Sequence, residues 1–282
     1  KFHSLGGKQD MLKGKKVAVI GGGKMGGIIA EGLITQEIVP AKNITIADID
    51  AKRLDFLRTS MKTNITQDNE KAVKNADIII LAVKPQNMIV TLLGIRPVIN
   101  KSKTVISIAA GITTKLIGKH LNQGVRIVRV MPNTPALVGE GAAAVAPGRF
   151  ARAADVNITR AIFNAVGISV EVKEKMMDAV TGLSGSGPAY FFLIIEALIE
   201  AGFQSGLPRK LAKQLAAQTM LGAARLCMES DKEPAQLREM VTSPNGTTFE
   251  GLKVMEANNV RKIMVATVQA ATRRSRELAK GK

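Results

Sequence analysis

The sequence predicts an α/β fold in which an N-terminal doubly wound sheet is followed by an all-helical C-terminal domain. Three observations lead to this prediction. A short apolar strand runs into a cluster of glycines and then into a helix at residues 16–29. Strand and helix patterns alternate from there to Val172, as in parallel sheets covered by helices. Beyond Val172 the strand signals stop, and the later segments have helical spacing.

Length and composition fit two domains. A chain of 282 residues accommodates about two domains of roughly 150 residues each. We expect them at residues 11–172 and 173–282. Residues 1–10 end just before Met11 and lack the apolar core of a signal peptide, so we expect them to be an added segment outside the fold.

The glycine cluster has the spacing of a Rossmann-like dinucleotide-binding turn. Gly21, Gly23 and Gly26 follow four apolar residues in the pattern G-x-G-x-x-G. In such turns the glycines allow a tight bend, close approach of a pyrophosphate and close packing of helix on strand. The helix that begins near Lys24 would offer its first amide N–H groups to the phosphates. The alternative is a glycine-rich turn that binds no ligand.

Six further apolar stretches extend the predicted sheet. Function is expected where parallel strands end at their carboxyl termini. The seven candidate strands are Val17–Ile20, Ile44–Ala47, Ile78–Val83, Thr104–Ile108, Arg126–Val130, Ala142–Ala146 and Ser169–Val172.

The end of the second strand bears on which nucleotide binds. Asp48 lies about 20 positions beyond the glycines, where an acidic side chain accepts hydrogen bonds from a ribose hydroxyl. Lys52 and Arg53 follow and could instead pair with a 2′-phosphate. The sequence therefore predicts NADH or NADPH without choosing between them.

Three more strand ends are candidate cofactor contacts. One runs into a turn stopped by proline, another ends in small residues against which a flat ring can lie, and a third leaves an asparagine free to point into the cleft. These residues are Ala82, Val83, Lys84 and Pro85, then Ala109, Ala110 and Gly111, and finally Asn133. Each could also belong to an ordinary loop.

The C-terminal half predicts a domain that needs a partner. We expect helices at Lys173–Ser184, Pro188–Phe203, Pro208–Glu229 and Glu233–Val241. The second of these is apolar nearly all round, and a domain of about 110 residues can hardly bury it alone. We therefore expect a homodimer, or a higher homo-oligomer, that shares this domain.

A turn near residue 245 is the candidate substrate site. Ser243, Asn245, Gly246, Thr247 and Thr248 place hydroxyls and backbone N–H groups at the start of a helix, an arrangement that suits a small carboxylate. Thr247 with the glutamate three positions later has the form of a capping box. The alternative is a capped turn without a ligand.

Taken together, these motifs resemble those of the pyrroline-5-carboxylate reductase family over about Lys15–Leu278. The matching residues, in order, are Gly21-x-Gly23-x-Met25-Gly26, Ala82-Val83-Lys84-Pro85-Gln86, Met131-Pro132-Asn133-Thr134-Pro135, Leu183-Ser184-Gly185-Ser186-Gly187-Pro188-Ala189-Tyr190, Gly206-Leu207-Pro208 and Ser243-Pro244-x-Gly246-x-Thr248. The resemblance implies hydride transfer from NADPH or NADH to the C=N bond of 1-pyrroline-5-carboxylate, which gives L-proline in the last step of proline biosynthesis.

The resemblance also implies roles for particular residues. In the family, a serine and backbone amides hold the substrate carboxylate, and these correspond to Ser243, Gly246, Thr247 and Thr248. The threonine that hydrogen-bonds the ring nitrogen corresponds to Thr248, and Asn69 matches an asparagine that contacts the cofactor. Asn245 departs from the family, which usually has glycine there. A protonated imine accepts hydride readily, so the reaction requires no histidine base and no metal.

Two rival functions are weighed against this one. A β-hydroxyacid dehydrogenase also joins a Rossmann domain to a helical one, but its acid/base lysine would fall at Phe191, which cannot transfer a proton. The second rival is a cofactor-sensing or nucleic-acid-binding scaffold that uses the net charge of +17. Basic residues are spread along the chain and aromatic residues make up only 3%, so no stacking platform for nucleic acid is expected.

The remaining composition predicts a cytoplasmic protein. Cys227 is the only cysteine, which excludes an internal disulfide and fits a reducing compartment. Glutamates at 196 and 200 interrupt the longest apolar run, so we expect no membrane span of about 18 apolar residues.

Overall fold

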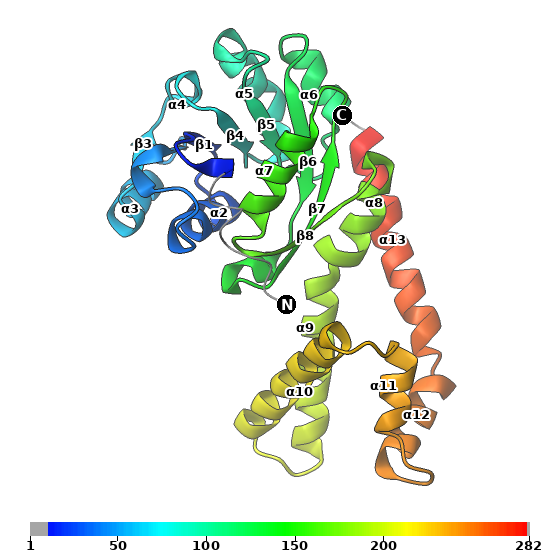
Figure 1. Ribbon diagram of the computed structural model, residues 1–282. Helices are drawn as coiled ribbons and strands as arrows, with labels where there is room; N and C mark the ends of the chain where they lie inside the picture. The colour runs from blue at the N-terminus through cyan, green and yellow to red at the C-terminus, as the bar shows by residue number, and fades with distance from the viewer. Residues whose placement is uncertain (1–10, 281–282) are drawn as a thin grey trace. The chain divides into compact units, whose positions relative to one another are not determined.

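The structure is a computed structural model that describes residues 11–280 (Figure 1). The described residues form two compact units, one ending at Gly185 and resuming at Ala271, the other comprising Ser186–Ala270. Residues 1–10, which we expected to be an added segment, lie outside the described residues. The predicted domain boundary after Val172 stays a prediction. The division between the two compact units falls between Gly185 and Ser186.

The first unit is built on one eight-stranded sheet with the order β3-β2-β1-β4-β5-β6-β7-β8. Strands β1 to β6 are parallel, which confirms the doubly wound fold. The strands are β1 Val17–Ile20, β2 Ile44–Ala47, β3 Asn64–Thr66, β4 Ile78–Leu81, β5 Thr104–Ser107, β6 Arg126–Met131, β7 Gly141–Pro147 and β8 Gly167–Glu171. The strand β3 was not predicted, because its three residues are mostly polar.

Strand β7 departs from the predicted all-parallel sheet. It pairs antiparallel with β6, and β8 then pairs parallel with β7. Only the short 3₁₀ helix Thr134–Val138 separates β6 from β7. A connection of this length cannot carry the crossover that a parallel pair requires, so the chain reverses direction.

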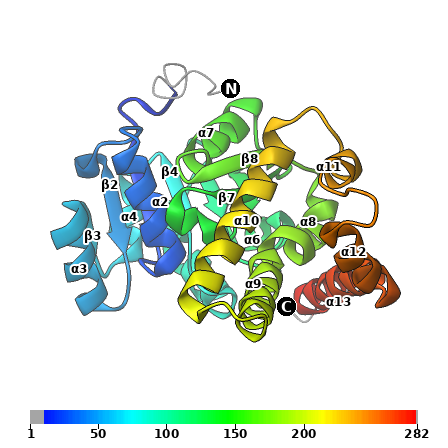
Figure 2. The same cartoon turned by 90° about the horizontal axis from the view of Figure 1, so that it is seen from below.

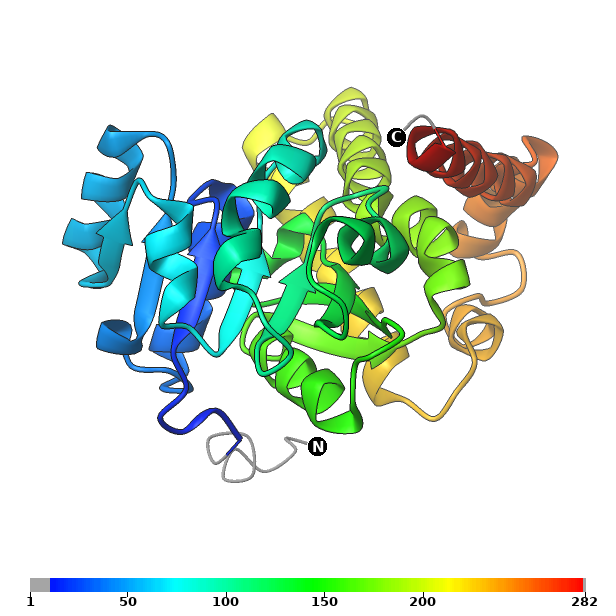
Figure 3. The same cartoon turned by 90° about the horizontal axis from the view of Figure 1, so that it is seen from above.

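Helices cover both faces of the sheet, as Figures 2 and 3 show from opposite directions. Alternate residues of each strand face opposite sides, so Val17 and Val19 belong to one core and Ala18 and Ile20 to the other. The first core is covered by α2 Lys24–Thr35, α3 Ala51–Met61 and α7 Ala153–Phe163, and the second by α4 Asn69–Lys74, α5 Met88–Ile95 and α6 Thr114–His120.

The chain leaves the sheet through a segment of changing helical type. The predicted continuous helix at 173–184 is instead a 3₁₀ turn Glu174–Met176, the short helix α8 Met177–Val180 and a π-helical turn Thr181–Gly185. The next three predicted helices are confirmed to within one residue at each end, as α9 Gly187–Gln204, α10 Arg209–Glu229 and α11 Pro234–Met240. Helices α12 Thr247–Ala257 and α13 Val260–Lys280 complete the described chain.

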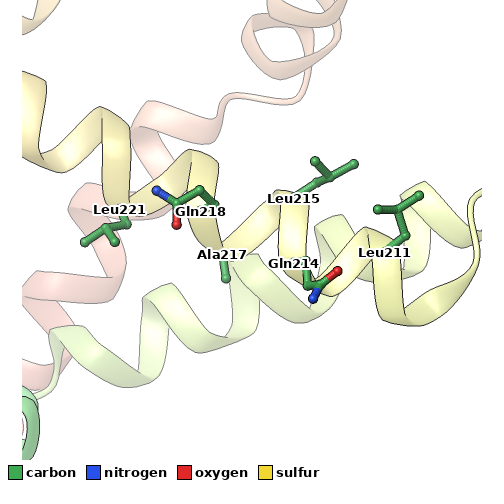
Figure 4. A pocket seen from close by; sticks show the side chains of 6 residues that line it. All are labelled: Leu211, Gln214, Leu215, Ala217, Gln218 and Leu221. Carbon is green, nitrogen blue, oxygen red and sulfur yellow. The ribbon is translucent and has the colours of Figure 1, made fainter.

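The second unit buries very little of its own surface. Between Ser186 and Ala270 only Gly187, Pro188 and Ala212 are buried. Large apolar side chains on α9 and α10 are exposed, Leu193 by 66% and Leu215 by 51%. Figure 4 shows six side chains of α10 that line one shallow pocket, Leu211, Gln214, Leu215, Ala217, Gln218 and Leu221. An unfilled apolar surface of this kind indicates an interaction site.

Among the described residues one helical stretch, Glu174–Gln204, is long and apolar enough to cross a membrane by length and composition, because it contains an 18-residue window with a mean hydropathy of 1.4. The sequence predicted no such segment, because the two glutamates were expected to rule it out. Only 17% of its most apolar window is buried within the chain. One such helix is weak support for a membrane protein, since an apolar helix covered by a partner subunit has the same composition.

Candidate active site

The three motif glycines differ in what surrounds them. Gly21 has φ +105°, and a Cβ there would lie 2.7 Å from the Ala82 carbonyl oxygen. A Cβ on Gly26 would lie 2.0 Å from the Gly21 carbonyl oxygen, whereas a Cβ on Gly23 would meet nothing within 4 Å. The first glycine therefore permits the turn, the third permits close packing of α2, and the second faces open space.

Helix α2 begins at this open space with its backbone donors free. Gly23 is the N-cap residue, and no side chain caps the helix. The amide N–H groups of Lys24 and Met25 belong to the first turn, where no intrahelical acceptor exists. Their partial positive charge and that of the helix dipole suit the phosphates of a dinucleotide.

Asp48, at the end of β2, holds the glycine turn in place. Its Oδ2 accepts a hydrogen bond from Gly22 N at 2.6 Å, and its Oδ1 accepts one from Asp50 N at 3.0 Å. On the other side of the turn, Arg53 Nε donates to the Gly22 carbonyl oxygen at 2.7 Å. Sequence reasoning missed Gly22, because the motif assigns no requirement to that position.

Asn69 lies beside this corner of the sheet. It is the first residue of α4, which Asp68 caps, and its side chain is partly buried. The preceding loop is tied to the end of β2, because Gln67 Nε2 donates to the Ile49 carbonyl oxygen at 3.0 Å. The structure thus places Asn69 at the carboxyl edge, on the β3 side of Asp48.

The ends of β4 and β5 continue the same edge. Ala82 N donates to the Ile20 carbonyl oxygen at 2.8 Å, so the β4 end abuts the glycine turn. Val83 is partly buried, Lys84 is exposed, and Pro85 opens a 3₁₀ turn. After β5, Ala109 and Gly111 are buried while Ala110 is exposed. Gly111 has φ +71°, which explains a glycine at that point.

Asn133, after β6, is not free to point into a cleft as predicted. Its Nδ2 donates to the Ser184 carbonyl oxygen at 3.1 Å, and its Oδ1 accepts from Ala142 N at 2.8 Å. The side chain is 9% exposed. The prediction of a free side chain was wrong, because the Ser184 carbonyl, 51 positions away, and Ala142 N, nine positions away, satisfy the amide. A cofactor contact by Asn133 stays a prediction.

The turn at residues 243–246 leads into α12. Gly246 N donates to the Ser243 carbonyl oxygen at 3.0 Å, and Asn245 has φ +58°. This positive φ explains why the family usually has glycine at the position of Asn245. Asparagine is among the non-glycine residues that tolerate a positive φ best. A Cβ on Gly246 would lie 2.3 Å from Ser243 Oγ and 3.1 Å from the Ser243 carbonyl oxygen, so any larger residue would require the serine side chain to rotate.

The predicted capping box is absent. Gly246, not Thr247, is the N-cap of α12, and no side chain caps the helix. Glu250 instead contacts Lys253, with Nζ and Oε2 3.1 Å apart. Thr247 and Thr248 are exposed in the first turn. The uncapped amides and hydroxyls of this turn can bind a carboxylate.

The structure therefore brings together the predicted cofactor residues at the carboxyl edge of one sheet. These are Gly21, Gly23, Lys24, Met25, Gly26, Asp48, Asn69, Ala82, Val83, Lys84, Pro85, Ala109, Ala110, Gly111 and Asn133. The residues from Ser243 to Thr248 belong to the other compact unit. That the two sets share one cleft stays a prediction.

Two protein families match the chain. The family described as pyrroline-5-carboxylate reductase dimerisation matches residues 174–278. The family described as NADP oxidoreductase, coenzyme F420-dependent, matches residues 16–111.

Full-length relatives agree with the first match. The pyrroline-5-carboxylate reductase of Methanosarcina acetivorans is 43% identical over 95% of this chain and 100% of its own length. That of Arabidopsis thaliana is also 43% identical, over 94% of this chain and 95% of its own length.

Solved structures share the fold. The pyrroline-5-carboxylate reductase of Coxiella burnetii has a TM-score of 0.90 at 39% identity, covering 94% of this chain and 98% of its own. The pyrroline carboxylate reductase of Plasmodium falciparum, solved with NADP bound, has a TM-score of 0.86 at 35% identity, covering 95% and 99%.

Proposed function

This chain belongs to the pyrroline-5-carboxylate reductase family, and we propose that it is an NAD(P)H-dependent reductase of 1-pyrroline-5-carboxylate. The reaction transfers a hydride to the C=N carbon and yields L-proline, the final step of proline biosynthesis. The observation that carries this proposal is the open space at Gly23 beside the uncapped start of α2. The chain also aligns with known reductases of this family over nearly their whole length.

The cofactor end of the site rests on the first unit. The first-turn amides of α2 would bind the pyrophosphate, and Asp48 would face the adenosine ribose. The turns at Ala82–Pro85 and Ala109–Gly111 would carry the nicotinamide end. Lys84 is exposed, and its charge would stay near the ribose of that end. When bound, NAD(P)H supplies the hydride, and these residues orient it.

The substrate end rests on the turn before α12. The Ser243 hydroxyl and the backbone amides of Gly246, Thr247 and Thr248 would hold the carboxylate. The Thr248 hydroxyl would hydrogen-bond the ring nitrogen and fix the face of the imine that meets the hydride. Because the protonated imine is already electrophilic, these residues need only position it, and proximity supplies most of the rate enhancement. Asn245 is the remaining member of this turn and can add an amide contact to the carboxylate.

A homodimer or larger homo-oligomer is part of this proposal. With only Gly187, Pro188 and Ala212 buried, the second unit lacks a core that could keep it folded alone. Its exposed leucines and phenylalanines require cover, and an equivalent surface on a second copy provides it symmetrically. The match to a dimerisation family supports this view.

We place the enzyme in the cytoplasm, as a soluble protein with no nucleic-acid or membrane partner. The net charge of +17 then serves to attract the anionic nucleotide, because a positive field raises the rate of encounter with anions.

Turnover with purified protein tests the proposal directly. We expect 1-pyrroline-5-carboxylate to cause oxidation of NADH or NADPH, followed by absorbance, with stoichiometric formation of L-proline measured by chromatography. A parallel reaction with a β-hydroxyacid and NAD(P)⁺ should show no reduction. The absence of turnover with either reduced cofactor, in protein whose circular dichroism shows a folded α/β chain, would contradict the assignment and favour a cofactor-sensing scaffold.

A further inference from the structure

Two carboxylates follow the end of β2, the place where a dinucleotide-binding fold holds the adenosine ribose. Asp48 directly follows β2 and is partly buried, and Asp50 lies two residues later and is exposed. The hydrogen bond from Gly22 N at 2.6 Å fixes the Asp48 carboxylate against the glycine turn. Its position is therefore set before any nucleotide arrives.

The Arg53 guanidinium, which could bind a phosphate here, is already engaged. Arg53 Nε donates to the Gly22 carbonyl oxygen, and its guanidinium lies 5.2 Å from the centre of the Phe56 ring. A Cβ built on Gly27 would lie 2.9 Å from Arg53 Nη2, which shows that this nitrogen is directed toward α2.

The start of α3 is occupied in the same way. Asp50 is its N-cap, and Oδ1 accepts hydrogen bonds from Lys52 N at 3.0 Å and Arg53 N at 3.2 Å. A phosphate would have to displace this carboxylate to reach the helix N-terminus. Lys52 is exposed, and no ion pair is described for it among residues 11–280.

We propose that this chain uses NADH in preference to NADPH. A free 2′-hydroxyl can donate a hydrogen bond to Asp48, whereas a 2′-phosphate would bring about two negative charges toward two carboxylates. Like charges a few ångströms apart repel even near a protein surface. The preference rests on the proposed function, but it concerns nucleotide binding and is measurable without the substrate.

Binding and turnover should both show this preference. We expect the dissociation constant for NADH, measured by calorimetry without substrate, to be at least about tenfold below that for NADPH, and kcat/KM to differ in the same direction, since each factor of ten needs only about 1.4 kcal/mol. Tighter binding of NADPH by the wild-type protein would overturn the proposal. Failure of the reductase reaction alone, with the binding preference intact, would count against the function and not against this inference.

A matched pair of charge variants separates local repulsion from net charge. Asp50→Asn can still cap α3, because asparagine caps as well as aspartate, and we expect it to strengthen NADPH binding about threefold to tenfold with little change for NADH. Asp55→Asn removes one charge from the exposed face of the same helix, where Asp55 pairs with Arg58, and should leave the ratio unchanged. Equal effects of the two variants would refute the assignment.

Discussion

Asn133 donates a hydrogen bond from its side-chain amide to the carbonyl oxygen of Ser184, 3.1 Å away in the π-helical turn. The same amide accepts a hydrogen bond from Ala142 N. One side chain thus ties the end of β6 to the start of β7 and to the segment that leads out of the sheet. Asn133 therefore has a structural role, because its side chain fixes the backbone at Ala142 and Ser184.

Replacing Asn133 should therefore lower stability. Asn133→Ala leaves a nearly buried donor and acceptor without partners, and we expect a loss of about 1–3 kcal/mol in the free energy of unfolding, measured by urea denaturation. Asn133→Asp keeps the acceptor for Ala142 N but sets a nearly buried carboxylate oxygen against the Ser184 carbonyl oxygen, so it should lose at least as much. An unchanged midpoint for the alanine variant would show that these hydrogen bonds contribute nothing net.

Two glycine variants should separate folding from cofactor binding. Gly26→Ala places a methyl group 2.0 Å from the Gly21 carbonyl oxygen, so we expect a loss of about 1–3 kcal/mol of stability together with weaker nucleotide binding. Gly23→Ala meets nothing in the protein within 4 Å and should unfold like the wild type. Its methyl group should still weaken NAD(P)H binding at least tenfold, because it occupies the approach of the pyrophosphate. Calorimetry of binding and thermal unfolding distinguish the two; equal nucleotide affinity in Gly23→Ala and wild type would remove this turn from the cofactor site.

The hydroxyl of Thr248 should matter for turnover. Thr248→Ala is expected to lower kcat/KM for 1-pyrroline-5-carboxylate by about tenfold to a hundredfold, as the loss of a hydrogen bond of ~1.5–3 kcal/mol would. Thr248→Ser retains the hydroxyl and should keep most of the activity. Steady-state kinetics at saturating cofactor measure both, and an alanine variant as active as the wild type would exclude Thr248 from the mechanism.

Assembly should depend on the apolar face of α9. Leu193→Asp puts a charge on a side chain that is 66% exposed within one chain, and burying that charge in an interface would be costly. We expect this variant to sediment as a monomer at micromolar concentration, while the wild type sediments as a dimer or larger species. Val90→Asp, on α5 of the first unit and 75% exposed, serves as the control and should not alter the assembly. A wild-type chain that is monomeric at this concentration would refute the oligomer.

Local sequence patterns predicted most of the fold. The strand at Val17–Ile20, the glycine turn and the start of α2 are specified within a dozen neighbouring residues, because burial, φ > 0 and helix initiation are properties of short segments. Pro208 likewise stands directly before α10. Where signals conflicted, prediction failed: Thr247 and Glu250 had capping-box spacing, but the tight turn at Asn245 made Gly246 the N-cap.

What only the tertiary structure decided is which distant groups meet. The order of the strands decides that β7 reverses and that Gly22 N donates a hydrogen bond to Asp48, 26 positions away. The path of α13 decides that Ser275 Oγ donates to Asp178 Oδ1, 97 positions away. The sequence by itself determined the family motifs, the parallel strands β1, β2, β4, β5 and β6, and the helices α9, α10 and α11. It left the partners of Asp48, Arg53 and Asn133 open, because a polar side chain shows which bonds it can make, and only the packed chain shows which acceptors and donors lie within reach.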